Sequence, residues 1–273
     1  MPNINDVKCI LIIGSTSGLG RGLALSILDL PSKPTVIVSG RRQERLDELT
    51  SSHGADGRLR AVKPIKLDVT ADRVTLKATI DDIIKTYPDL DAVMFSSGVQ
   101  YGSDFCKPET INLDDFFVEI HTNYTSVVTM ITFFLPHLIS LGESGRPTFL
   151  YTISSGVGIT PGPSVANYSA TKAAIHSLSI SLNVQLKEKN VHVVEILPPL
   201  VESELHDGQG TAETLSKYWM PLTEFTKLTM AELSTDAAQI PIGMAAHAYE
   251  KYEAGKLEAA DKFYELQKVT FNK

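Results

Sequence analysis

The sequence predicts a single α/β domain over residues 1–273, built on a doubly wound parallel sheet of six or seven strands with helices on both faces. Short, almost continuous apolar runs alternate with helical patterns along most of the chain, which is typical of strands buried on both faces of a parallel sheet. A chain of 273 residues with 43% hydrophobic and 21% charged residues is also long enough to bury one large core.

The first predicted strand, over residues 7–13, runs directly into a glycine-rich turn that precedes a helix over 21–28. A strand, a glycine turn and a helix in this order place a pyrophosphate on backbone N–H groups at the helix N-terminus. The spacing is G-x-x-x-G-x-G rather than the commoner G-x-G-x-x-G, and a bare glycine triplet also suits a tight turn. Between these flanking elements the pattern favours a Rossmann-type dinucleotide site. The expected cofactor contacts in the turn are Gly14, Ser15, Thr16, Ser17, Gly18, Leu19 and Gly20.

A second predicted strand, over residues 35–39, is followed by two arginines instead of an acidic residue. An Asp or Glu there would hold the ribose hydroxyls of NAD, whereas a guanidinium suits the extra phosphate of NADP through its charge and bidentate geometry. The alternative is that Arg41 and Arg42 only solvate the start of the next helix. We interpret them as cofactor contacts, so NADP(H) is the preferred cofactor and NAD(H) the alternative.

Two further strands are predicted over residues 61–67 and 90–95, with a helix over 71–87 between them. Asp68 follows the first of these strands, and it is expected either to accept from the adenine amino group or to cap the helix. A Ser-Ser-Gly sequence follows the second, where small residues let the backbone lie against the cofactor. The expected cofactor contacts here are Asp68, Val69, Ser97 and Gly98.

A long amphipathic helix is predicted over residues 113–141. Its apolar side is wide enough to cover the sheet and to contact another subunit. Asn123 lies in its middle, which is a poor place for asparagine unless the side chain makes specific hydrogen bonds. Nothing beside His121 or His137 suggests metal ligands, so no metal site is expected.

The expected chemistry lies around Tyr168. A strand ending at Ile153 is followed by a Gly/Pro-rich loop and by a helix over 164–189, on which Tyr168 and Lys172 lie one turn apart on the same face. Ser155 lies just past the strand, where parallel sheets present their functional groups. A positive neighbour lowers the pKa of a phenol, so Lys172 is expected to prepare Tyr168 for proton transfer at a carbonyl or alcohol oxygen. Ser155 would hydrogen-bond the same oxygen while charge develops on it.

A last strand is predicted over residues 191–197, and the pattern then loosens. Residues 200–232 mix glycine, aromatic and methionine residues, which suits a substrate lid or a plain packing excursion. Residues 235–273 are predicted as a helical C-terminal extension without a recognisable final strand. An apolar substrate pocket is indicated by Tyr101, Phe105, Trp219 and Phe225.

The amino-acid composition excludes some classes of binding partner. The net charge of −7 and the pI of about 5.5 argue against nucleic acid or an anionic membrane, because either needs a concentrated basic surface. Cys9 and Cys106 suit small apolar fillers in a reducing compartment. No signal-peptide pattern and no apolar run approaching a membrane span is found in the sequence, so a cytoplasmic location is expected.

Taken together, these motifs resemble the short-chain dehydrogenase/reductase family over about residues 7–203. Each motif is weak alone, but they occur in order, and Ser155 lies thirteen residues before Tyr168, which is the usual interval in that family. The motifs are the glycine turn, Asp68, Asn123, Ser155, the Tyr168-Ser169-Ala170-Thr171-Lys172 sequence and the P-P-L-V-E-S segment over 198–203.

The resemblance implies a nicotinamide cofactor, with Tyr168 as the acid/base and Ser155 as the partner of the substrate oxygen. It implies that Lys172 holds the nicotinamide ribose and lowers the pKa of Tyr168, and that Asn123 holds a water linking Lys172 to solvent. The paired helices over 113–141 and 164–189 would build a dimer. From the segment after the last predicted strand it adds Pro198, Val201 and Ser203 as cofactor contacts.

The sequence departs from the family pattern at several cofactor positions. Ile13 replaces a threonine, Ser96-Ser97-Gly98 replaces Asn-Ala-Gly, and Pro199 replaces a glycine. Ser203 stands where threonine is common, and Ser17 where many NADP-using members carry a basic residue. These departures bear on cofactor affinity more than on reaction type.

The predicted function is that of an NADP(H)-dependent oxidoreductase interconverting a ketone or aldehyde and its alcohol by hydride transfer. The predicted partners are a small, apolar carbonyl or alcohol substrate and further copies of the chain, in a homodimer or homotetramer. A catalytically silent NADP-binding regulatory or scaffold protein is the alternative, and a dehydratase or epimerase is a third hypothesis.

Overall fold

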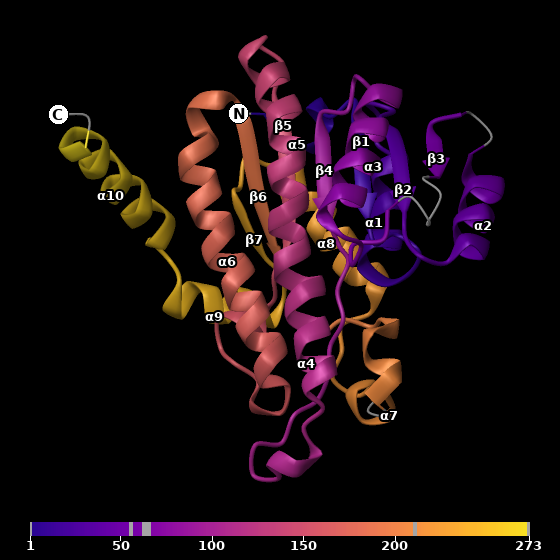
Figure 1. Ribbon diagram of the computed structural model, residues 1–273, viewed down its shortest axis with the longest axis vertical. Coiled ribbons are helices and arrows are strands. Elements are labelled where there is room, and N and C mark those ends of the chain that lie inside the picture. Colours follow the sequence, from indigo (N-terminus) through magenta and orange to yellow (C-terminus); the bar gives the residue numbers. More distant parts are fainter. Residues whose placement is uncertain (1, 55–56, 62–66, 210–211, 272–273) are drawn as a thin grey trace.

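The computed structural model describes residues 2–54, 57–61, 67–209 and 212–271. Its centre is one parallel sheet with the strand order β3-β2-β1-β4-β5-β6-β7 (Figure 1). Seven strands lie within the described residues, which confirms the predicted doubly wound sheet. They are β1 (Cys9–Ile13), β2 (Thr35–Ser39), β3 (Leu59–Ala61), β4 (Ala92–Phe95), β5 (Thr148–Ile153), β6 (Val191–Leu197) and β7 (Gln239–Pro241).

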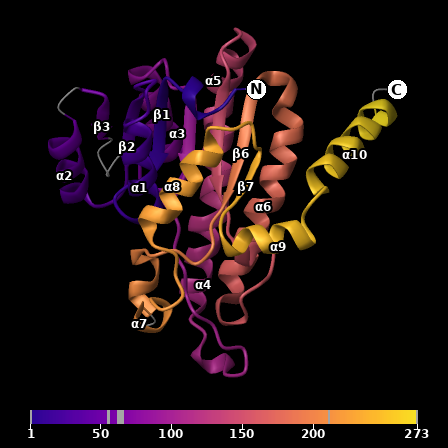
Figure 2. The same ribbon diagram turned by 180° about the vertical axis from the view of Figure 1, so that it is seen from behind.

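Helices cover both faces of the sheet (Figures 1 and 2). Successive side chains of a strand point to opposite faces, so Ile10 and Ile12 of β1 pack on one side and Leu11 and Ile13 on the other. The first side is covered by α1 (Gly18–Leu28), α2 (Gln43–His53) and α8 (Leu222–Leu233). The second side is covered by α3 (Arg73–Thr86), α5 (Ser126–Glu143) and α6 (Ala166–Leu186).

The predicted helix over 113–141 is interrupted. It consists of α4 (Leu113–Ile120), a π-helical turn (His121–Thr125) and α5. The 31-residue stretch Leu113–Glu143 is long and apolar enough to span a membrane by length and composition, which corrects the expectation that no run approaches such a length. In this fold its Met130, Phe134 and Leu138 are instead fully buried against the sheet.

Two strand predictions differ from the structure. Residues 62–66, most of the predicted third strand, lie outside the described residues, and the described strand there is β3, which pairs with β2. The segment after residue 235, in which no final strand could be recognised, contains β7, which pairs with β6 and is the seventh strand. That strand has three residues and ends in a proline, which is tolerated at a sheet edge, so it gives almost no pattern in the sequence. Three helices complete the described chain: α7 (Ala212–Leu215), α9 (Met244–Tyr252) and α10 (Lys256–Phe271).

A buried polar network fixes α6 to the sheet and to α9. The two ring nitrogens of His176 on α6 face Glu195 of β6 at 2.9 Å and Glu253, just after α9, at 3.0 Å. All three side chains are less than one tenth exposed. Burial opposes the charged form of His176, but the hydrogen bonds and charges of the two carboxylates outweigh it and raise the pKa of the imidazole. His176 therefore acts as a buried cation that joins three elements.

Replacing this histidine is expected to change how stability depends on pH. Because the pKa of His176 is raised in the folded state, its contribution is complete below the unfolded value of about 6.5 and is lost as pH rises through the folded value. His176→Gln should cost about 3 kcal/mol at pH 6, since it leaves the buried carboxylate of Glu195 without its cation, whereas Glu253 keeps Lys256 at 2.7 Å. The difference from wild type should shrink at higher pH, as measured by urea unfolding between pH 6 and 9.

His53→Gln is the matched control, because His53 lies exposed at the end of α2. It should leave the pH dependence unchanged. A wild-type advantage over His176→Gln that is equally large at pH 6 and pH 9 would contradict the assignment of a buried imidazolium.

Candidate active site

The candidate site is a cavity of about 570 Å³ at the carboxyl ends of the strands. The glycine turn, the ends of β2, β4 and β5, and the first turns of α6 all contribute to its wall. Open parallel sheets bind their ligands at this edge, where the strand order reverses. The predicted residues that line the cavity are Gly14, Thr16, Ser17, Gly18, Leu19, Arg41, Arg42, Val69, Ser97, Gly98, Tyr168, Lys172 and Ser203.

The glycine turn is shaped by close backbone approach. Gly14 has φ +86°, and a Cβ built on it would lie 2.5 Å from the main-chain nitrogen of Ser97. A Cβ on Gly20 would lie 2.3 Å from the carbonyl oxygen of Gly14. Ser15 is fully buried, and its hydroxyl accepts from the Ser39 N–H at 2.9 Å. Neither Gly20 nor Ser15 lines the cavity, so both support the turn rather than its wall.

Arg42 joins the two walls of the cavity. Its guanidinium donates to Thr16 Oγ1 at 3.1 Å and to Ser17 Oγ at 2.6 Å, both on the glycine turn. It also pairs with Glu204, which follows β6 and was not singled out in the sequence. Arg45, one turn into α2, pairs with the same carboxylate. The arginine end of the cavity therefore already holds an acidic group.

Asp68 lies beside the cavity without lining it. Its carboxylate accepts from the Thr70 N–H at 2.9 Å and from the Thr70 hydroxyl at 2.8 Å. The N-cap of α3 is Asp72, so the predicted alternative of Asp68 as a helix cap is wrong. Asp68 instead fixes the turn that presents Val69 to the cavity.

Only part of the segment after β6 contributes to the wall of the cavity. Ser203, Glu204 and Leu205 line the cavity, whereas Pro198 and Val201 do not. The Pro198 carbonyl accepts from the Gly156 N–H at 2.9 Å, and Val201 is buried and bridged to Met220. Both residues therefore shape the backbone behind the site.

Tyr168 and Lys172 lie at the cavity on the first turns of α6. Both are buried, and the Lys172 Nζ lies 5.4 Å from the centroid of the Tyr168 ring. The Nζ donates to the main-chain oxygen of Ile153, the last residue of β5, at 2.8 Å. Ser155 follows two residues later, and its Oγ accepts from the Val157 N–H at 3.3 Å. The lysine is thus fixed to the end of β5, whereas Ser155, two residues further on, does not itself line the cavity.

The pKa values differ from the sequence-based expectation. Burial, with a smaller contribution from Glu119, raises the pKa of Tyr168 instead of lowering it. Burial lowers the pKa of Lys172 to about 8, although Glu119 opposes that shift. The physical reason is desolvation, which penalises the charged form of both groups and is the largest cause of each shift. In this structure Tyr168 is a protonated phenol at neutral pH.

Asn123 lies in the π-helical turn, and its buried side chain uses both ends of its amide. Its Oδ1 accepts from the Val99 N–H and its Nδ2 donates to the Val99 carbonyl, both at 2.9 Å. The Nδ2 also donates to Thr171 Oγ1 at 3.2 Å. Asn123 therefore joins the loop after β4 to α6, beside Lys172. π-Helical turns are frequent at functional sites, which agrees with the expectation that this asparagine makes specific hydrogen bonds.

Glu119 is a site residue that the sequence reasoning missed. It is fully buried on α4, where it accepts from the Tyr101 N–H at 3.0 Å and from Asn167 Nδ2 at 2.5 Å. Burial raises its pKa. The signal was present, because Glu119 lies four residues before Asn123 and so faces the same side of the helix.

Of the four residues predicted to form an apolar substrate pocket, Tyr101 lines the cavity. Phe225 is fully buried between α8 and the sheet, and Phe105 is 64% exposed on a loop. Trp219 is partly exposed and does not line the cavity. Among the residues that the structure describes, no cluster of histidine, cysteine, aspartate or glutamate could hold a metal ion.

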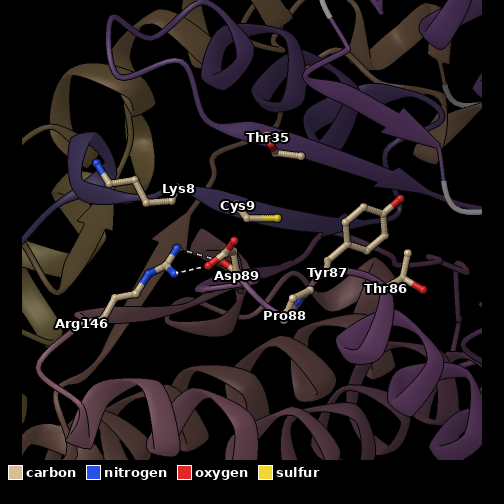
Figure 3. A pocket seen from close by; sticks show the side chains of 8 residues that line it. All are labelled: Lys8, Cys9, Thr35, Thr86, Tyr87, Pro88, Asp89 and Arg146. Atoms are coloured by element: carbon tan, nitrogen blue, oxygen red, sulfur yellow. Dashed lines mark hydrogen bonds and ion pairs between the residues drawn. The ribbon is translucent and has the colours of Figure 1, made fainter.

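A second hollow of about 590 Å³ lies at the opposite edge of the sheet (Figure 3). Arg146 pairs there with Asp89 at 2.9 Å and with Asp91 at 2.6 Å. Asp91 also accepts from the Lys8 and Cys9 N–H groups. These groups tie β1 to the start of β4 and β5, so this hollow holds a structural ion pair and none of the predicted catalytic residues.

Comparison with known proteins agrees with this geometry. A family model described as short chain dehydrogenase matches residues 8–214. The chain is 33% identical over 208 residues to the uncharacterized oxidoreductase DltE of Bacillus subtilis, covering 74% of this chain and 76% of that protein. It is 27% identical over 223 residues to an NADP-dependent 3-hydroxy acid dehydrogenase of Schizosaccharomyces pombe, covering 80% and 83%.

The fold is also that of a solved short-chain dehydrogenase from Sphingobium yanoikuyae in complex with NADPH. The TM-score is 0.76 at 20% identity, over 95% of each chain. The family match covers most of this chain and includes both the glycine turn and the Tyr168-x-x-x-Lys172 pair. The chain therefore belongs to the short-chain dehydrogenase family of oxidoreductases.

Proposed function

We propose that the protein is an NADP(H)-dependent oxidoreductase that interconverts a ketone or aldehyde and the corresponding alcohol, with Tyr168 as the general acid/base. One observation carries the proposal: Tyr168 and Lys172 line the same cavity as the glycine turn and the two arginines. A dinucleotide on that turn would reach from the arginine end toward the phenol. The relative from Schizosaccharomyces pombe supports this reading, since its name gives NADP as cofactor and a 3-hydroxy acid as substrate.

The residues of the cavity fit a dinucleotide. The turn around Gly14 leaves no space for a Cβ, so backbone and not side chains form that wall. The Ser97 hydroxyl is buried with no hydrogen-bond partner in the described part of the chain, and it lies at this cavity. Arg41 and Arg42 would hold the 2′-phosphate, and Lys172 the nicotinamide ribose. When bound, the nicotinamide supplies or accepts the hydride.

Tyr168 is the proposed proton donor in the direction of carbonyl reduction. Its raised pKa keeps it protonated at neutral pH, ready to give its proton to a carbonyl oxygen that gains negative charge. The neighbouring ammonium of Lys172 would stabilise the phenolate that remains. Ser155 is proposed to donate a hydrogen bond to the same oxygen. Asn123 is proposed to hold α6 in place against the loop that follows β4.

We propose a small, apolar substrate, with Tyr101 as part of its pocket and residues 200–221 as a lid over it. Residues 222–233 are left out of that lid because α8 packs on α1 in the core. We propose a cytoplasmic homodimer or homotetramer as the assembly. Exposed Leu113 and Phe117 on α4 support an interface on that helix.

Replacing Tyr168 by phenylalanine removes the transferable proton and keeps the ring. NADPH oxidation with a panel of ketones and aldehydes should fall by about 10²- to 10⁴-fold in kcat. Tyr252→Phe is the matched control, because it removes an exposed phenol that does not line the cavity, and it should stay within a few-fold of wild type. Retention of more than a tenth of wild-type kcat by a folded Tyr168→Phe protein would remove Tyr168 from this role.

The pH dependence of carbonyl reduction should follow the ionisation of Lys172. Because its pKa is about 8 in the free protein, its ammonium is present below that value and is lost above it. The kcat/KM for carbonyl reduction should therefore fall above pH 8, and Lys172→Met should show a lower rate without this limb. An identical descending limb in wild type and Lys172→Met would show that another group titrates.

A further inference from the structure

The arginine end of the cavity contains a carboxylate where the proposed cofactor would place a phosphate. Glu204 is the first residue of a short 3₁₀ helix after β6, and it lines the cavity together with Arg41 and Arg42. One of its oxygens pairs with Arg42 at 2.5 Å and the other pairs with Arg45. The side chain is 38% exposed, so it sits at the mouth of the site and not in the core.

The hydrogen bonds of Arg42 leave little for another anion. A guanidinium has five N–H donors. Within the described residues, four hydrogen bonds already run from it to Thr16, Ser17 and Glu204. A bidentate grip on a phosphate needs two donors side by side, so at least one of these partners must yield. Glu204 is the only anion among the three, and it would repel the incoming phosphate.

Glu204 is ionised in this arrangement. Burial opposes its charged form, but the hydrogen bonds and charges of Arg42 and Arg45 outweigh burial and lower its pKa. The Glu204 carboxylate therefore carries a negative charge at neutral pH. It offers Arg42 the negative charge and the acceptor oxygens that a 2′-phosphate would offer, from the opposite wall of the cavity.

We infer that Glu204 shifts the balance between NADP(H) and NAD(H) by competing with the 2′-phosphate for Arg42. This inference rests on the proposed binding of a nicotinamide nucleotide. NADP(H) must displace the carboxylate, and NAD(H) need not. Glu204 therefore weakens the selectivity for NADP(H) that the arginines would otherwise give. Displacement also releases the attachment of the 204–209 segment to α2.

The test measures binding by calorimetry, with ligands that separate the phosphate from the rest of the cofactor. Adenosine 2′,5′-bisphosphate and NADPH carry the 2′-phosphate, whereas 5′-AMP and NADH lack it. Glu204→Gln should bind the first pair roughly five-fold more tightly than wild type, as expected for loss of an exposed ion pair, and the second pair within about two-fold. Raising the ionic strength should reduce the gain.

Two further variants make the result specific. Glu202→Gln removes the same charge two residues away, where the carboxylate accepts only from the Leu222 N–H among the described residues, and it should change neither affinity. Combining Glu204→Gln with Arg42→Gln should abolish the gain, because the competitor and its target are then both gone.

Each other outcome decides the question. An unchanged or weaker affinity of Glu204→Gln for the 2′-phosphate ligands overturns the inference, and so does an equal gain for 5′-AMP and NADH. In those cases wild type still binds nucleotides, so the proposed function stands. If neither wild type nor Glu204→Gln binds any of the four ligands, the proposed function fails and the inference falls with it.

Discussion

The hydrogen bond from Lys172 Nζ to the Ile153 carbonyl is the contact on which the rest of the site depends. It fixes a side chain of α6 to the last residue of β5, so the helix cannot slide along the sheet without leaving a buried ammonium unpaired. A buried amine needs such an acceptor, because desolvation penalises its charged form. The contact also sets the position of Tyr168, whose ring lies 5.4 Å from the same ammonium.

Three buried ionisable groups surround this contact, and burial moves each of them toward its neutral form. The pKa of Glu119 is raised, that of Tyr168 is raised, and that of Lys172 is lowered to about 8. Below pH 8 Lys172 still carries its charge, and a desolvated site of this kind responds strongly when charge develops on a bound oxygen. The opposite end of the cavity keeps its charged groups. There Arg42 and Arg45 are partly exposed to solvent and form ion pairs with the carboxylate of Glu204.

The sequence was sufficient for the fold class, for the glycine turn and for the Tyr168–Lys172 pair at the cavity. Strands buried on both faces and a glycine turn are local patterns, and Tyr168 and Lys172 needed only a helix to be brought together. It was insufficient where the outcome depends on distant elements. Glu204 reaches Arg42 across 162 positions of the chain, β7 is visible only through its pairing with β6, and the pKa of Tyr168 follows from burial that no local pattern records.

The most direct measurement of the central contact is the pKa of Lys172 itself. In protein labelled with ¹³C at the lysine Cε, a ¹H–¹³C titration should show one lysine resonance with a pKa of about 8, and Lys172→Met should remove that resonance. The ordinary pKa of a lysine is about 10.4. If every lysine titrates near that ordinary value, Lys172 is not held desolvated at the end of β5, and the proposed acid/base site loses its physical basis.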